Sequence, residues 1–263
     1  MLRSVTIGQH IPGDSLIHRL DPRTKILSSI VLIVLLFVVK GFIGYGLVAL
    51  GIALVVRASN IPLRFVLRGV RPLMVILVFT LTLHLFMTDG RIIFQIWFLK
   101  VTWEGLIRGL MMGTRLLLLI IGTSMLTLTT SPMQLTDGIE TLLRPGKKIG
   151  IPAHELAMMM TIALRFIPTL LEETEKIMKA QMARGADFQS GGLTQRAKSL
   201  LPLLVPLFVN AFRRADDLAI AMEARGYRGG EGRTKLKELK FQRVDAVAMG
   251  LVLSFALVVG ALF

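Results

Sequence analysis

Five long apolar stretches constrain what this chain can fold into more than any other feature. A helix needs roughly 17–25 mostly apolar residues to cross a bilayer. Hydrophobic residues make up 53% of the chain and charged residues 18%, a balance untypical of soluble domains. The sequence therefore predicts an all-α, polytopic membrane protein with about five transmembrane helices. The predicted spans are Ile26–Val39, Phe42–Val56, Pro72–Met87, Leu106–Leu128 and Val244–Phe263.

The first two stretches are short, and only Lys40 and Gly41 separate them. A helical hairpin with Lys40 at the membrane interface and a single long tilted span both fit this pattern. Residues 91–105 are apolar but interrupted by charges, and they include Trp97 and Trp103. Tryptophan favours the headgroup level, so we interpret this segment as interfacial.

Basic residues in the short connections predict the orientation, because Lys and Arg are enriched on the cytoplasmic side. Residues 57–71 hold four arginines and no acid, whereas residues 89–105 hold two bases and two acids. The N-terminus and the stretch 129–243 are therefore expected in the cytoplasm. We expect an N-terminal membrane domain of four helices (1–128), a cytoplasmic module (129–243) and a C-terminal transmembrane helix (244–263).

The net charge of +14 raises the question of a nucleic-acid partner. Residues 129–243 hold 18 basic and 12 acidic residues, so the cytoplasmic module has only a modest excess for its length. The positive charge is mostly of the topogenic kind, and no nucleic-acid partner is expected. The chain has no cysteine, which excludes disulfides and thiolate metal sites.

The cytoplasmic module carries two long helical patterns. Apolar or small residues recur at three-four spacing over 153–183 and again over 200–224. Pro168 should bend the first helix, because proline removes a backbone hydrogen bond. Pro202 and Pro206 are expected in the first turns of the second.

Both patterns end in the triplet Ala-Arg-Gly, and a shift of 41 residues superposes the two. Alanine allows close approach of another surface, arginine supplies a fork of donors, and glycine permits the positive φ that ends a helix. Each triplet could also be a simple helix cap with an arginine that compensates the dipole. Duplication favours two matching sockets on a partner. The residues are Ala183, Arg184, Gly185, Ala224, Arg225 and Gly226.

Several motifs together resemble the transmembrane T component of energy-coupling factor transporters, the group that includes the CbiQ proteins of cobalt uptake. They span nearly the whole chain: "PGDSLIHRLDPRTKI", "LTLTTSP", "ALRFIPTLLEE", "AQMARG" and "LLVPLFVNAFRRADDLAIAMEARGYRG". The resemblance implies that the two long helices are crossed coupling helices. Their Ala-Arg-Gly ends would dock on two ABC-type ATPase subunits.

The resemblance also implies a separate S component that captures a vitamin or transition metal, with this chain as scaffold in a bacterial or archaeal cell membrane. No G-x-x-x-x-G-K-[ST] pattern occurs, so ATP and Mg are expected on the partner ATPases and no cofactor in this chain. Neither catalytic nor metal-binding residues are expected, because the histidines are scattered.

A self-contained channel or secondary carrier is the alternative function, but it would require polar midplane residues or broken helices in matched halves. Arg115 and His84 lie inside predicted spans, and we expect structural roles for both, with Arg115 snorkelling or pairing with Glu104 or Asp89.

The crossed helices cannot cover each other along their whole length, so some apolar surface is left for a partner. The candidate S-component contacts are Leu203, Leu204, Leu207 and Phe208. Burial against the chain's own spans is the alternative for these four residues.

Overall fold

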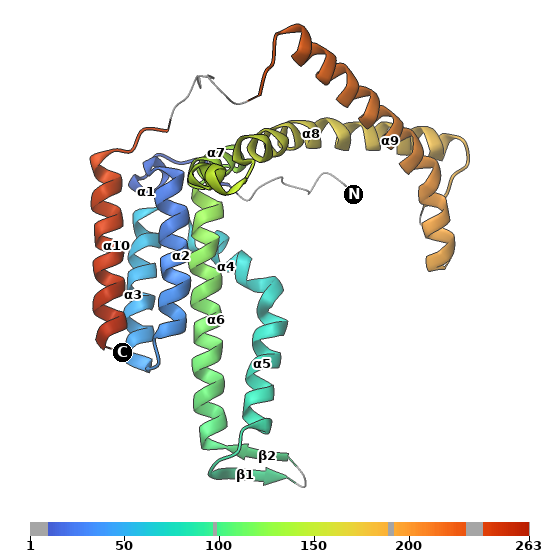
Figure 1. Cartoon of the computed structure of the whole chain (residues 1–263). Helices are drawn as coiled ribbons and strands as arrows, with labels where there is room; N and C mark the ends of the chain where they lie inside the picture. The colour runs from blue at the N-terminus through green and yellow to red at the C-terminus, as the bar shows by residue number, and fades with distance from the viewer. Residues whose placement is uncertain (1–9, 97–98, 189–191, 230–238, 263) are drawn as a thin grey trace. The chain divides into compact units, whose positions relative to one another are not determined.

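The computed structural model describes residues 10–96, 99–188, 192–229 and 239–262 (Figure 1). It contains two compact units. Of the described residues, 10–138 and 239–262 belong to the membrane unit, and 139–229 belong to the two-helix unit. All five predicted spans fall in the membrane unit.

Each predicted span forms a helix, which confirms the all-α class. After the short α1 (Leu16–Arg19), the spans are α2 (Pro22–Val38), α3 (Phe42–Ala58), α4 with η2 and α5 (Leu63–Val70, Arg71–Leu73, Met74–Met87), α6 (Trp103–Thr129) and α10 (Arg243–Leu262). By length and composition, four helical stretches in the described residues could cross a membrane: Leu63–Met87, Trp103–Thr129, Ala153–Ala183 and Arg243–Leu262. At 17 residues each, α2 and α3 lie at the lower limit for a span.

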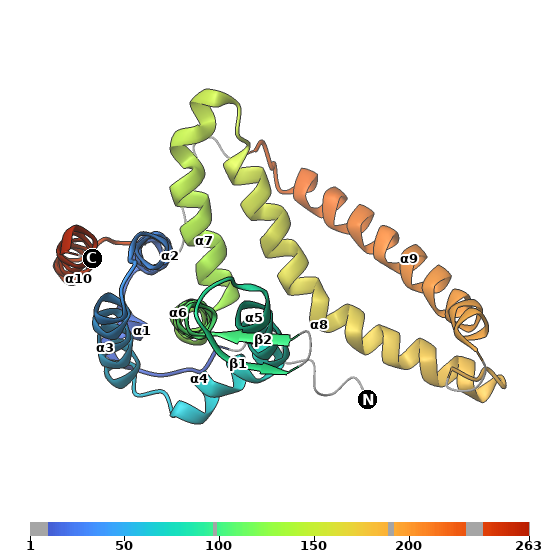
Figure 2. The ribbon, with the colours of Figure 1, turned by 90° about the horizontal axis from the view of Figure 1, so that it is seen from below.

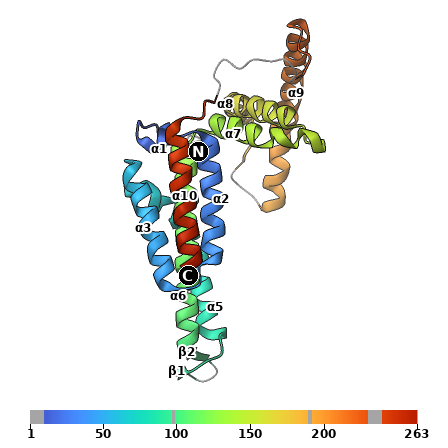
Figure 3. The ribbon, with the colours of Figure 1, turned by 60° about the vertical axis from the view of Figure 1, so that its left-hand side comes forward.

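The first two spans form a helical hairpin and not one tilted helix. Helix α2 ends at Val38 and α3 begins at Phe42, with Gly41 as an extended N-cap. Figure 3 shows the two helices running in opposite directions on either side of α10. The single-span alternative is therefore wrong.

The core of the membrane unit lies where α2, α3 and α6 meet. Leu36, Val39 and Val48 are fully buried there. Gly122 of α6 lies against the end of the Leu32 side chain of α2, and a Cβ at that position would fit only if this flexible side chain moved. The glycine thus lets α6 approach α2 closely.

Apolar stripes on the outer faces of α2 and α10 are exposed. On α2 the stripe consists of Leu27, Ile30, Val34 and Phe37, at helical spacing. Soluble proteins rarely expose contiguous apolar surface of this extent, whereas lipid tails cover it without cost. The membrane unit is therefore built to face a bilayer.

A two-stranded antiparallel sheet connects α5 to α6 and was not predicted. Strand β1 (Ile92–Ile96) pairs with β2 (Leu99–Thr102), with Ile96 opposite Leu99 and an irregularity between Ile92 and Phe94. Trp97 lies outside the described residues, and Trp103 is exposed in the first turn of α6. The interfacial position of this segment stays a prediction.

Asp245 joins the start of α10 to the start of α2. Its two carboxylate oxygens accept hydrogen bonds from the backbone N–H of Asp21 (2.7 Å) and of Gln242 (2.9 Å). Asp21 caps α2 by accepting from the Arg23 N–H, and Arg23 also donates to the Leu239 carbonyl. These bonds fasten the last helix of the chain to the first span.

Arg115 has a structural role, as expected, but its partners differ from those predicted. Its Nε donates to the Tyr45 hydroxyl at 2.9 Å, and its guanidinium carbon lies 5.3 Å from the centre of the Phe37 ring. Glu104 instead accepts from the backbone N–H of Arg91. Two aromatic side chains, and not one of the carboxylates offered as an alternative to snorkelling, therefore stabilise the guanidinium.

The two-helix unit consists chiefly of α8 (Ala153–Ala183) and α9 (Leu193–Ala224). Helix α7 (Pro132–Leu143), which bridges the two units, and η3 (Arg144–Ile149) precede them and were not predicted.

Helix α9 begins seven residues earlier than the apolar pattern indicated, so Pro202 and Pro206 lie well inside the helix and not in its first turns. Its first turns are polar, which periodicity does not detect. Figure 2 shows α8 bending along its length, as Pro168 predicts.

Candidate partner-docking site

Helices α8 and α9 run antiparallel where they meet, near the end of α8. Asn210 Nδ2 donates to Glu173 Oε1 at 2.6 Å, and Arg214 donates to Glu173 Oε2 at 3.4 Å. Eight residues further along α8, Gln181 Nε2 donates to the Pro202 carbonyl at 3.4 Å. Toward the start of α8 and the end of α9 the two helices diverge (Figure 2).

Glu173 fixes the angle and register of this crossing. Its carboxylate is mostly buried and accepts from both Asn210 and Arg214, and charge-assisted hydrogen bonds of this kind are stronger than neutral ones. Sequence analysis did not predict the cluster of Glu173, Asn210 and Arg214. Glu173 belongs to a run of acidic residues, which is typical of a helix face exposed to water. A glutamate flanked by two other acids gives no sign of which one turns inward.

The two Ala-Arg-Gly ends have the same backbone geometry. In α8 the N–H of Ala186 donates to the Gln181 carbonyl (2.9 Å) and that of Gly185 donates to Met182 (3.0 Å). In α9 the N–H of Tyr227 donates to Met222 (3.0 Å) and that of Gly226 donates to Glu223 (2.8 Å). This is the same pair of capping bonds, shifted by 41 residues.

The glycines are required by that geometry. Gly185 has φ of 89° and Gly226 has φ of 71°, where other residues are strained. A Cβ added at either position would meet no other atom within 4 Å, so backbone conformation and not crowding selects glycine.

Arg184 and Arg225 occupy the equivalent position just after each helix. Both side chains are exposed, and neither makes a hydrogen bond or ion pair with another described residue. The alanines before them, Ala183 and Ala224, are exposed too. Each end therefore presents a small residue and a free guanidinium fork on a rigid cap, and Figure 1 shows the two ends at separate points of the two-helix unit.

The structure separates the four residues predicted to contact an S component. Leu203 is only 5% exposed and Leu207 is half-buried, whereas Leu204 is 40% and Phe208 60% exposed. Leu203 therefore belongs to the packed interior of the two-helix unit. The exposed pair belongs to a longer exposed apolar stripe, and sequence analysis missed its other four residues. The whole stripe, called the α9 stripe, consists of Leu201, Leu204, Val205, Phe208, Val209 and Phe212.

Comparison with known proteins decides the family. The profile of the cobalt transport protein family CbiQ matches residues 13–236. The chain belongs to this family. The energy-coupling factor transporter transmembrane protein EcfT of Thermosediminibacter oceani is 63% identical over 247 residues, covering 94% of this chain and 93% of the relative. The EcfT protein of Bacillus subtilis is 51% identical over 259 residues, 98% of each chain.

This membership confirms the predicted resemblance to the T component. As a member of this family, the chain is a polytopic, non-catalytic transport subunit. This function takes precedence over the alternative of a self-contained channel or carrier. The motif "RLDPRTK" also gains a structural role. Its Asp21 and Arg23 join α2 to residues at the start of α10, and Lys25 Nζ donates to the carbonyls of His18 and Thr129, both at 3.1 Å.

Proposed function

We propose that this chain is the scaffold and coupling subunit of an energy-coupling factor importer for a vitamin or transition metal. Two ABC-type ATPase subunits, which bind ATP and Mg, dock on the helix ends. Ala183, Arg184 and Gly185 meet one ATPase, and Ala224, Arg225 and Gly226 meet the other. An S component that holds the substrate packs on the apolar surface of α9.

The single observation that carries this proposal is that the ends of α8 and α9 have the same sequence and the same backbone geometry. Two ATPase subunits of one type have equivalent grooves, and equivalent grooves need equivalent ligands. The shared capping bonds, the shared positive φ and the two unpartnered guanidinium groups meet that need. Arginine suits such a groove because its planar fork matches carboxylates and carbonyls.

The proposed orientation puts the N-terminus and residues 129–243 in the cytoplasm, where ATP is available. Helix α8 is apolar enough to cross a membrane by composition. However, its second half holds Glu172, Glu173, Glu175, Lys176 and Lys179. Charges at bilayer depth are costly, so we place α8 outside the bilayer core.

Purification tests the composition of the complex. Full-length chain with an affinity tag, extracted in mild detergent from cells that express the whole transporter, should carry two nucleotide-binding subunits per chain and one S component. Native mass spectrometry measures these ratios. A chain that transports substrate after reconstitution without any ATPase would contradict the proposal.

Labelling of single cysteines tests the orientation, since the chain has none of its own. A membrane-impermeant maleimide should label Asp89→Cys on intact cells, but Lys148→Cys and Gln195→Cys only after lysis. All three positions are exposed. Lys148 and Gln195 flank α8, so labelling of these two from opposite sides would show that α8 spans the membrane and would overturn the cytoplasmic placement.

A further inference from the structure

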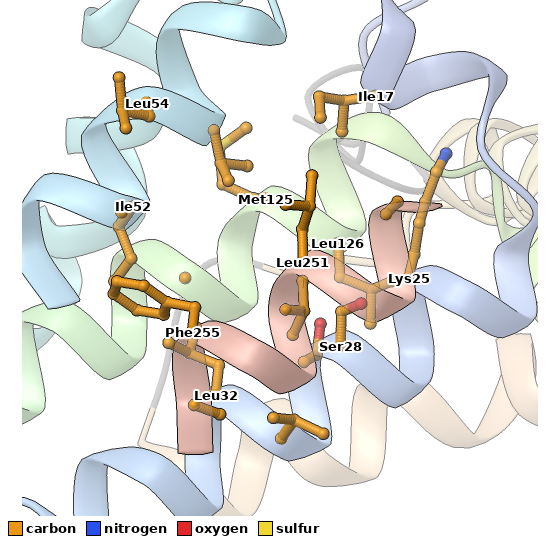
Figure 4. A pocket seen from close by; sticks show the side chains of 18 of the residues that line it. Ile17, Lys25, Ser28, Leu32, Ile52, Leu54, Met125, Leu126, Leu251 and Phe255 are labelled. Atoms are coloured by element: carbon orange, nitrogen blue, oxygen red, sulfur yellow. The ribbon is translucent and has the colours of Figure 1, made fainter. Parts of the chain in front are cut away.

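The membrane unit contains an apolar cavity of about 510 Å³ between α2, α3, α6 and α10. Figure 4 shows Leu32, Ile52, Met125, Leu251 and Phe255 converging on it from these four helices. The cavity lies within the size range of small-molecule pockets, roughly 300–1,000 Å³. No residue of the two-helix unit lines it.

The cavity is elongated along the helices. Its lining on α2 runs from Lys25 to Leu35, which at 1.5 Å per residue corresponds to about 15 Å. On α10 it runs from Ala248 to Ala256. A long narrow space parallel to transmembrane helices has the direction of a lipid tail.

The two ends of the cavity differ in chemistry. Its polar lining residues, Lys25, Ser28, Ser29 and Thr129, lie at the end where α2 begins. The remainder of the lining consists of aliphatic side chains, glycines, Met125 and Phe255. An occupant that matches this lining has a polar head at one end and a long apolar body.

Lys25 supplies a positive charge at the polar end. The residue is 7% exposed, and its ammonium donates to two backbone carbonyls, which leaves one of its three N–H donors without an acceptor among the described residues. The neighbouring carboxylates of Asp21 and Asp245 accept hydrogen bonds from backbone N–H groups instead. An anionic headgroup would therefore meet an ammonium that has no direct ion pair.

The cavity opens sideways between α3 and α10. Leu54 and Leu251 line it and are nevertheless 60% and 65% exposed. Deeper in, the Phe255 ring packs against Gly51, so α3 and α10 are in contact there. The opening thus lies on the surface that faces lipid, and a bilayer molecule can enter without crossing water.

We propose that this cavity binds one acyl chain of a bilayer phospholipid, with its phosphate at the Lys25 end. The acyl chain of the lipid fills the space between α2, α3 and α10 and packs these helices together. Close packing is the normal condition of protein interiors, and an acyl chain supplies the contacts that the helices lack.

Photocrosslinking of the full-length chain in vesicles of phosphatidylethanolamine and phosphatidylglycerol tests the proposal. The probe is phosphatidylglycerol with a diazirine in the middle of one acyl chain. Adducts should concentrate on peptides that contain Gly51–Val55 and Leu251–Phe255. Ala248→Phe fills the cavity from α10 and should lose most of this labelling.

The matched control is Ala246→Phe, two residues away on the opposite, exposed face of α10. It should keep the wild-type pattern. If Ala248→Phe does not accumulate, Ser29→Leu fills the same space from α2. Unlabelled phosphatidylglycerol should reduce crosslinking by the probe more than palmitate does. Equal reduction by the two would contradict the proposed contact between the phosphate and Lys25. Labelling spread evenly over lipid-facing residues, or unchanged in the filled variants, would overturn the proposal entirely.

Discussion

Replacing both Arg184 and Arg225 by alanine is expected to remove nearly all ATP-driven substrate uptake, while the chain still inserts into the membrane. Each arginine would donate charge-assisted hydrogen bonds to an ATPase groove, worth roughly 1.5–3 kcal/mol. Since 1.4 kcal/mol is a factor of about ten in affinity, each single variant should weaken its docking site by roughly 10- to 100-fold.

The two losses should add in the double variant, because the helix ends are separate sites with no shared contacts. Folding should be spared. The side chains are exposed and unpartnered, and backbone bonds together with Gly185 and Gly226 maintain the caps. Uptake of radiolabelled substrate in cells and ATPase retention during purification are the two measurements.

The chain offers a matched control. Arg165 and Arg213 are exposed arginines on the same two helices, away from the ends, and their double alanine variant loses the same charge. It should retain uptake. Lysine at positions 184 and 225 should restore only part of the activity, because an ammonium lacks the planar fork. An intact complex with normal uptake in the double alanine variant would refute the docking role.

The spans could be predicted because their signal is local. Helices α6 and α10 differ by at most three residues at either end from the predicted stretches, since an apolar run and its polar ends specify a transmembrane helix without tertiary information. The β1–β2 hairpin was missed for the opposite reason. Its residues alternate poorly and carry an irregular register, so no period-two pattern indicates strands.

Contacts between distant residues could not be predicted. Asp245 lies 224 residues from Asp21, and only the folded chain shows that one carboxylate accepts hydrogen bonds at the starts of two helices. The helix ends were accessible to sequence analysis because a triplet with a positive-φ glycine is a local motif. The helix crossing was not, because it depends on which of Glu172, Glu173 and Glu175 turns toward α9.

Placing aspartate at Leu204 or Phe208 is expected to release the S component while both ATPases stay bound. Both side chains belong to the exposed α9 stripe, and the proposed function makes that stripe the seat of the S component. A carboxylate in an apolar interface would lose its hydration without gaining a partner, which is strongly unfavourable. Quantitative mass spectrometry of the purified complex measures the ratio of each subunit to this chain.

Leu203 and Gln195 make this test specific. Leu203 is next to Leu204 in sequence but buried, so Leu203→Asp should lower the amount of folded chain and not release one subunit selectively. Gln195 is exposed on another face of α9, and Gln195→Asp should leave the complex complete. Loss of all subunits with Phe208→Asp would instead place the stripe in the chain's own core. An unchanged S-component ratio with both aspartate variants would move the seat away from α9, because a stripe that tolerates a charge at either of two positions faces water or lipid headgroups and not a protein.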